Sequence, residues 1–292
     1  MARVRIGSSS WKYDSWEGLV YAPGSPESYL AQYARSFDTV EIDQWFWSLF
    51  ESPTPRLPEP ATAAQYAASV PEDFRFTIKV PNSITLTHHY AKGRAKTEAL
   101  RPNAHFLSRE LFAAFLEGIR PLHGRVGALI FQFEYLNRQK IASQEEFHDR
   151  FGEFASGLRC PLPCAVEVRN PKWLNDGYLD LLGRCGFAPC LLQGYYMPDL
   201  REVVRSLQGP LQRCPWLVLR LHGPDRQGIE ESSGGRWDRV IAPKDAEIEE
   251  LSGIVSSLLA RGLDIYLNVN NHYEGSAPLS IAKIRAAIER RS

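Results

Sequence analysis

Hydrophobic and polar positions alternate in short stretches along the chain, most clearly in 264–275, DIYLNVNNHYEG. Ile265, Leu267 and Val269 alternate there with a tyrosine and two asparagines. Because successive side chains of an extended chain point to opposite faces, one face of this strand is aliphatic and the other carries amides. The same pattern recurs along the chain, each time ahead of a segment with helical spacing. It therefore predicts repeated strand–helix units.

Eight such units follow one another without a linker or a break in composition. The predicted strands are 3–8, 39–43, 75–80, 126–133, 165–169, 188–193, 216–222 and 264–270. The predicted helices are 28–37, 61–68, 106–119, 143–158, 175–185, 199–207, 244–260 and 278–288. Ser143 and Glu146 have capping-box spacing, and Gly262 is placed to end a helix. We expect loops at 81–103, which is long and polar, and at 223–240, which is rich in glycine.

Alternating strands and helices indicate a parallel sheet covered by helices. Eight units in 292 residues fit one closed (β/α)₈ TIM barrel that spans 1–292 as a single domain. An open doubly wound sheet is the alternative architecture. It would need edge strands, and the predicted strands lack the many charges that mark such edges.

Strand parity in a barrel sends one set of side chains outward to the helices and the other set into the interior. The inward set is polar at the strand ends: Glu41, Asp43, Lys79, Gln132, Glu167, Arg169, Arg220, His222, Asn268 and Asn270, with His272 just beyond. Burying unpaired charges costs several kcal/mol, so this concentration favours a ligand site at the mouth of the barrel. The alternative is a self-neutralising lattice of ion pairs, which fits Arg5 and Arg75 best because they come early in their strands.

Composition narrows the function classes. Lys and Arg balance Asp and Glu at 34 each, so no global basic field steers the protein to DNA or to an anionic membrane. The five cysteines form no CxxC, which disfavours a disulfide framework and a zinc ribbon. No apolar run reaches the length of a membrane span and the N-terminus lacks an apolar leader, so we expect a cytoplasmic protein without membrane contact.

Seven motifs in register resemble the YecE-like family, a domain of unknown function, over essentially the whole chain. They are GSSSWKY at 7–13, Glu41-Ile42, Lys79-Val80-Pro81, Gln132-Phe133, EVRNP at 167–171, RLHG at 220–223 and NNHYEGSAP at 270–278. The resemblance implies a TIM-type barrel that is remotely similar to the xylose isomerase and endonuclease IV group. It supplies no established reaction, and fold analogy suggests nucleic-acid binding or phosphodiester chemistry.

The chain departs from the family pattern at three places. Ser10 replaces a glycine before Trp11, so the turn there is expected to differ. The segment DQWFW at 43–47 replaces Asn-Ser-Thr-Phe-Tyr, which brings two tryptophans to the rim. Glu134 and Tyr135 follow Gln132-Phe133 where prolines are usual.

The polar strand ends suit an anionic ligand. Arginine can hold a phosphate or carboxylate bidentately, and a lysine or a protonated histidine can assist. We therefore expect a small phosphorylated or nucleotide-like ligand, with phosphoester hydrolysis as the expected type of reaction. The predicted catalytic residues are Glu41, Glu167 and His222, the two glutamates acting as base and acid. The predicted binding residues are Trp11, Lys79, Gln132, Arg169, Arg220, Asn268, Asn270, His272 and Tyr273.

No cofactor or metal is expected, because three cations near the mouth oppose a divalent ion and the ligand set is too small for a three-metal centre. The alternative function is a non-catalytic protein that binds single-stranded nucleic acid or another partner. Its support is an aromatic rim of Trp11, Tyr13, Trp16, Trp45, Trp47, Tyr195, Tyr196, Trp237 and Tyr273. A basic loop with His88, His89, Lys92, Arg94 and Lys96 could contact phosphates. The sequence makes no prediction of the oligomeric state.

Overall fold

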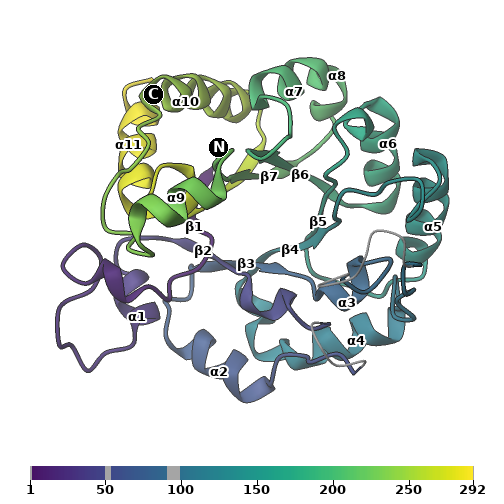
Figure 1. Cartoon of the computed structure of the whole chain (residues 1–292), viewed down its shortest axis with the longest axis horizontal. Coiled ribbons are helices and arrows are strands. Elements are labelled where there is room, and N and C mark those ends of the chain that lie inside the picture. Colours follow the sequence, from purple (N-terminus) through teal and green to yellow (C-terminus); the bar gives the residue numbers. More distant parts are fainter. Residues whose placement is uncertain (1, 50–53, 91–98, 292) are drawn as a thin grey trace.

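The computed structural model describes residues 2–49, 54–90 and 99–291. Eight parallel strands form a ring, and helices surround it (Figure 1). The strands are β1 (Val4–Ser8), β2 (Thr39–Ile42), β3 (Arg75–Lys79), β4 (Val126–Gln132), β5 (Cys164–Glu167), β6 (Ala188–Gln193), β7 (Trp216–Leu221) and β8 (Asp264–Val269). Their hydrogen-bonded order is β1-β8-β7-β6-β5-β4-β3-β2, so β2 to β8 pair in sequence order and β1 pairs with β8. This confirms the predicted (β/α)₈ barrel.

The outer layer consists of helices and short 3₁₀ turns. The helices are α1 (Tyr29–Tyr33), α2 (Pro60–Ala68), α3 (Asn82–Thr85), α4 (Arg109–Gly118), α5 (Gln144–Ser156), α6 (Asp176–Cys185), α7 (Leu200–Ser206), α8 (Gln208–Leu211), α9 (Arg226–Ser233), α10 (Asp245–Ala260) and α11 (Ala277–Glu289). The 3₁₀ turns are η1 (Asp14–Trp16), η2 (Gln44–Phe46), η3 (Arg120–Arg125), η4 (Pro171–Trp173) and η5 (Asn271–Tyr273). Several of these turns directly follow strands and carry residues of the barrel mouth.

The ring closes between β1 and β2 through a side chain. The hydroxyl of Tyr33 accepts a hydrogen bond from the Ser8 backbone N–H at 2.8 Å and donates one to the Thr39 carbonyl oxygen at 3.2 Å. Gly7 packs so tightly against β2 that a Cβ there would lie 1.9 Å from the same carbonyl oxygen. Only glycine fits position 7. The buried Tyr33 hydroxyl bonds to the Ser8 N–H and the Thr39 carbonyl, which would pair with backbone groups if β1 and β2 formed a regular ladder.

Two apolar cores lie on either side of the strands. Large aromatic and aliphatic side chains fill the space between sheet and helices. The interior holds smaller ones: Ala128, Ile130, Ala165, Ala188, Cys190 and Val218. Because these residues leave room above them, the polar side chains of the next layer can meet across the barrel. The parity prediction is confirmed, since Glu41, Lys79, Glu167 and Arg220 lie inside with their outward neighbours packed on helices.

Several element boundaries differ from the predictions. The glycine-rich segment 223–240 contains a helix, α9, whose first turn is capped by the Asp225 side chain accepting from the Gly228 N–H at 2.9 Å. The prediction of a loop was wrong there, because the glycines at both ends indicated a loop although the residues between them form a short amphipathic helix. The predicted helix 28–37 is regular only over α1. The segment 81–103 begins with α3, and Lys92, Arg94 and Lys96 lie outside the described residues.

One strand contains a residue that is unusual in a central position. Pro189 lies in β6 and has no N–H for the ladder. The register between β5 and β6 covers only Ala165 with Ala188 and Val166 with Pro189, whereas β7 and β8 pair over six positions. All five cysteines are unbridged thiols. No helix in the described parts of the chain has the length and apolar character needed to cross a bilayer.

The turn after β1 keeps a glycine-like backbone although a serine stands there. Ser10 has a φ of 128°, a region that L-residues rarely adopt and glycine enters freely. A residue held in such a region costs about 1–3 kcal/mol. A different turn had been expected because serine replaces the family glycine. Instead, the turn is kept and Ser10 is strained.

Replacing Ser10 with glycine should relieve this strain. Glycine also makes the unfolded chain more flexible, which offsets part of the gain. We therefore expect S10G to raise the free energy of unfolding, measured in urea titrations, by a net amount of about 1 kcal/mol. The matched control is S9G, because Ser9 is buried nearby and is not among the residues with a positive φ, so a glycine there relieves no strain. Unchanged or reduced stability of S10G would contradict the strain.

Candidate functional site at the barrel mouth

A buried charge network spans the barrel interior, and we call it the inner lattice: Glu41, Gln132, Glu167, Arg220 and Asn268. These residues come from β2, β4, β5, β7 and β8, so the contacts connect strands across the barrel. Arg220 is 1% exposed, and both glutamates are fully buried. The strands thus bring together five of the residues that parity predicted.

Arg220 is the centre of the inner lattice. Its Nε and Nη2 donate to the two carboxylate oxygens of Glu41, each at 2.8 Å, which is a bidentate pair. Its Nη1 donates to Glu167 at 2.5 Å and to the Gln132 amide oxygen at 3.0 Å. Asn268 donates to Glu41 at 3.1 Å. Arg220 is therefore committed to protein partners and has little capacity left for a ligand.

The two arginines determine the charge state of Glu167. Burial alone would raise the pKa of Glu167, but Arg220 and Arg169 outweigh it and lower that pKa to about 2. Arg169 reaches the second carboxylate oxygen through its Nε at 2.9 Å. Burial opposes the charge on Arg220 as well, yet Glu167 and Glu41 raise its pKa well above the ordinary value. Glu167 therefore stays ionised near neutral pH, which does not suit a general acid.

Above the inner lattice lies a second set of side chains, the mouth groups: Asp43, Lys79, Arg169, Tyr195 and His222. Lys79 is only 7% exposed, and it makes no ion pair within the described residues. Its Nζ lies 4.2 Å from the centre of the Phe46 ring. Burial, and then the positive charge of Arg220, lower the pKa of Lys79 to about 8. The mouth thus holds a buried cation that forms no salt bridge in the described part of the chain, although Glu41, Asp43 and Glu167 are within electrostatic reach and favour its charge.

His222 is buried beside the same cations. Burial, followed by the charges of Arg220 and Arg169, lowers the pKa of His222 well below its ordinary value, so the imidazole is neutral. Its Nδ1 lies 3.3 Å from the Tyr195 hydroxyl, and its Nε2 has no hydrogen-bond partner among the described residues. Tyr195 itself has a φ of 54°, a strained value that places its ring between His222 and Arg169.

Asp43 is the half-buried acid of this set. Burial raises the pKa of Asp43 to about 6, and Lys79 opposes this rise while Glu41 adds to it. Asp43 and Lys79 influence each other's charge but do not form an ion pair. Both groups therefore change protonation near neutral pH, unlike Glu167.

The remaining predicted site residues belong to the core or to the loops around the mouth, and His272 is close enough to His222 to help lower the pKa of that histidine. Trp11 is 3% exposed and packs edge-on against Tyr66 at 5.0 Å, so it belongs to the core. Tyr273 is buried on the outer side, in a small pocket with residues of α7 and α10. Asn270 caps η5, and His272 contacts Asn270 and the Glu230 carboxylate on α9 at 3.0 Å. These four residues stabilise the loops around the mouth.

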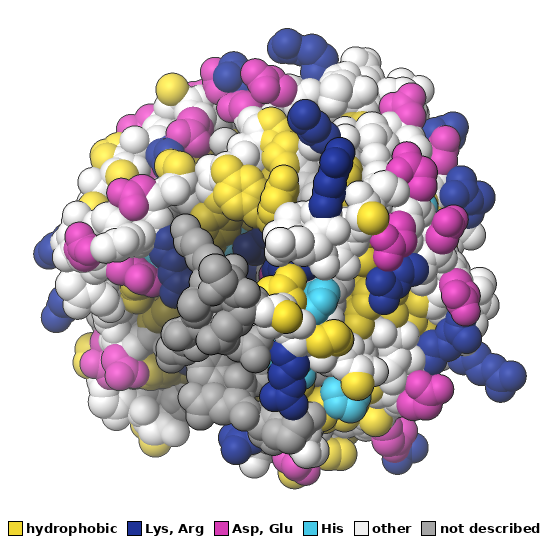
Figure 2. Space-filling model, turned by 45° about the vertical axis from the view of Figure 1, so that its right-hand side comes forward, with side chains coloured by type: hydrophobic (Ala, Val, Ile, Leu, Met, Phe, Trp, Pro, Cys, Tyr) yellow, Lys and Arg dark blue, Asp and Glu magenta, His cyan; other side chains and the backbone are white. Residues whose placement is uncertain are grey.

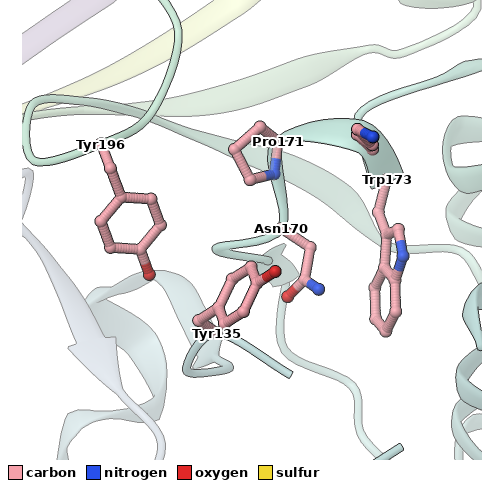
Figure 3. Close-up of a pocket in the computed structure, with 6 residues that line it drawn as sticks. Tyr135, Asn170, Pro171, Trp173 and Tyr196 are labelled. Atoms are coloured by element: carbon pink, nitrogen blue, oxygen red, sulfur yellow. The ribbon is translucent and has the colours of Figure 1, made fainter. Parts of the chain in front are cut away.

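A pocket of about 580 Å³ lies beside the mouth, and we call it the side pocket (Figure 3). It is lined by Tyr135, Asn170, Pro171, Lys172, Trp173 and Tyr196, from the loops after β4, β5 and β6. Tyr196 was predicted to belong to the aromatic rim, whereas no role was predicted for Tyr135 or Trp173. Both follow a predicted strand closely, and this position in the sequence could have indicated that they lie near the mouth.

The opposite end of the barrel has its own pocket of about 340 Å³, which includes Arg3, Arg5 and Arg75. Arg3 and Arg5 pair with Asp38 at 3.0 and 3.2 Å, and Arg75 donates to backbone carbonyls. Arg5 therefore forms an ion pair, as one interpretation of the sequence suggested. Arg75 instead donates hydrogen bonds to backbone carbonyl groups.

Elsewhere on the surface, charges of both signs are mixed. In the view of Figure 2, Lys and Arg are scattered among Asp and Glu, with no large basic patch. Within residues 2–49, 54–90 and 99–291, no group of three His, Cys, Asp or Glu side chains could hold a metal ion.

Removing the centre of the inner lattice should be costly. Arg220→Met keeps the volume but leaves Glu41 and Glu167 buried without their main partner, so we expect a loss of about 3–5 kcal/mol in unfolding free energy at neutral pH. The control is Arg213→Met, whose partner Asp180 lies 2.6 Å away in an exposed pair. That variant should lose less than about 1 kcal/mol. Equal losses in the two variants would contradict a central role for Arg220.

Comparisons with known proteins agree with this fold. The family model described as "Protein of unknown function DUF72" matches residues 5–292. The UPF0759 protein YecE of Escherichia coli K12 is 25% identical over 176 residues, which cover 60% of this chain and 51% of YecE. The YecE of Escherichia coli O157:H7 matches equally. The chain thus matches about half the length of these curated relatives.

Two solved structures share the whole architecture. A DUF72 family protein of Enterococcus faecalis V583 has a TM-score of 0.68 at 20% identity, covering 98% of this chain and 95% of that one. A DUF72 family protein of Thermotoga maritima MSB8 has a TM-score of 0.63 at 21% identity, covering 98% and 99%. The family match over nearly the full length confirms the YecE-like resemblance: the chain belongs to the DUF72 family of uncharacterised proteins.

Proposed function

We propose that the barrel mouth binds a small anionic ligand, such as a phosphorylated compound, through Lys79 and Arg169. The observation that carries this proposal is the buried Lys79 ammonium, which has no ion-pair partner among the described residues. A buried charge without a partner is costly, and functional sites are where such costs are usually found. An anion at the mouth would offset the desolvation that lowers the pKa of Lys79.

Arg169 is the second ligand-binding candidate. It contributes its Nε–H to Glu167, and its side chain is 22% exposed at the mouth. Its guanidinium lies over the Tyr195 ring, with the central carbon 5.2 Å from the ring centre. The fork of terminal nitrogens is suited to bidentate contact with phosphate or carboxylate oxygens. Arg220, by contrast, supports the site from below by holding both glutamates.

We also propose that the site hydrolyses a bound phosphoester. In this reaction the side chains at the mouth act as general acid and base. His222 is neutral with an unused Nε2, and Asp43 has a pKa of about 6, so both suit general acid–base roles. Glu41 and Glu167, predicted as base and acid, are bonded to arginines. Their proposed role is to fix Arg220 and Arg169.

Non-catalytic binding of single-stranded nucleic acid is the second candidate. Its support is that exposed aromatic rings gather on the loops at the strand ends: Trp47, Tyr90, Tyr135 and Tyr196. A panel of phosphoesters and glycosides separates the two functions. Turnover that is lost in His222→Gln supports the enzyme, whereas ligand binding without turnover of any compound supports the binding protein.

Removing the lysine charge should weaken anion binding. We expect Lys79→Met to bind ribose 5-phosphate at least about tenfold more weakly than the unaltered protein in calorimetric titrations, because a buried charge contact is lost. The control is Arg138→Met, which removes an exposed cation six residues beyond the end of β4 at Gln132 and outside the mouth groups. Equal affinity of the two variants would remove Lys79 from the site.

The pH dependence has a definite sign. Lys79 is protonated below its pKa of about 8, and only the charged form attracts an anion. Sulfate keeps its charge in this range, so its affinity should fall as pH rises from about 7 to about 9. A constant sulfate affinity across that interval would argue against the assignment.

A further inference from the structure

The side pocket beside the mouth has aromatic walls and enough space to hold a flat ring. Resting on the proposed function, we propose that the ligand is a nucleotide whose base lies in the side pocket and whose phosphate lies at Lys79 and Arg169. The pocket volume of about 580 Å³ leaves ample room for a nucleoside.

Exposed aromatic rings form two walls of the side pocket. Tyr135 is 50% exposed and Tyr196 is 58% exposed, and their ring centres lie 5.9 Å apart at an angle of 88°. Figure 3 shows Tyr196 and Trp173 on opposite sides of Pro171 and Tyr135. Trp173 is half-buried and packs against Phe147 at 5.4 Å, which fixes its ring from behind. Large rings left open to water on one face are a ready platform for stacking.

The walls of the side pocket are tied together before any ligand binds. The Asn170 side chain accepts from the Leu136 N–H and donates to the Leu136 carbonyl oxygen, both at 2.9 Å. This reciprocal pair joins the loop after β5 to the loop that carries Tyr135. A preformed pocket loses less free energy in ordering when it binds.

The polar groups of the side pocket favour a base over a sugar. Recognition of a sugar ring needs hydrogen-bond partners for several hydroxyl groups, whereas a base can bind through its face alone. One donor and one acceptor of the Asn170 amide are already used, so the tyrosine hydroxyls, the Trp173 indole N–H and the exposed Lys172 are the main polar side-chain groups that remain. Stacking of this kind tolerates different bases, so the inference does not specify which base binds.

The side pocket and the mouth are directly connected along the chain. Arg169 precedes Asn170, and Tyr195 precedes Tyr196, so each pair places one residue at the mouth and the next in the pocket wall. Burial raises the pKa of Tyr196 and the Arg169 guanidinium opposes that rise, so the two side chains lie within electrostatic reach. Arg169 therefore lies near the side pocket, and in this proposal it is the residue at which one ligand spans the two places.

Calorimetric titrations with three probes test this inference: adenosine 5′-monophosphate, ribose 5-phosphate and adenosine. We expect the nucleotide to bind about tenfold more tightly than the sugar phosphate, which is the effect of one stacked base. Tyr196→Ala should abolish most of this difference while leaving the affinity for ribose 5-phosphate unchanged. Tyr90→Ala is the matched control, because Tyr90 is also an exposed tyrosine but follows β3, outside the pocket.

The possible failures are distinguishable. Equal affinities for the nucleotide and the sugar phosphate would overturn the base site while the phosphate site stands. Absence of binding by both phosphorylated probes would overturn the proposed function and this inference with it. Binding of adenosine that is weakened by Tyr196→Ala, but not by Tyr90→Ala, supports the base site independently of the phosphate.

Discussion

The arrangement of the barrel mouth depends on one interaction, the contact of Arg220 with Glu41 and Glu167 across the interior. The three residues come from β7, β2 and β5, so the contacts join strands that are not neighbours in the sheet. Small side chains such as Ala128, Ala165 and Cys190 below them provide the space. Removing one partner of such a buried pair leaves an uncompensated charge, so the network must remain intact as a unit.

This network helps to explain why Asp43 and Lys79, which lie above it, titrate near neutral pH. Arg220 and Arg169 neutralise Glu167, so Asp43 is the acid near Lys79 that has no ion pair among the described residues. Burial and Arg220 lower the pKa of Lys79 to about 8, and burial raises that of Asp43 to about 6. Charges fixed in the inner lattice thus prepare a site whose own groups remain responsive to a ligand.

Much of this could be predicted from the sequence because strand parity is a strict period of two. It placed Glu41, Lys79 and Arg220 inside the barrel correctly. It could not say which charges pair, since pairing depends on distances across the barrel and not along it. Parity also ends with the strand: Trp11 and Tyr273 lie in turns, where local backbone geometry directs Trp11 into the core and Tyr273 towards α7 and α10. α9 and the side pocket also lie beyond the strand ends, so strand parity could not predict them.

The central claim is that the inner lattice leaves Lys79 buried, charged and ready for an anion. Nuclear magnetic resonance titration of the Lys79 side chain, with and without ribose 5-phosphate, tests it most directly. The account predicts a pKa of about 8 in the unliganded protein and a clear rise when the ligand is added. A pKa near the ordinary lysine value of about 10.4, unmoved by the ligand, would contradict it.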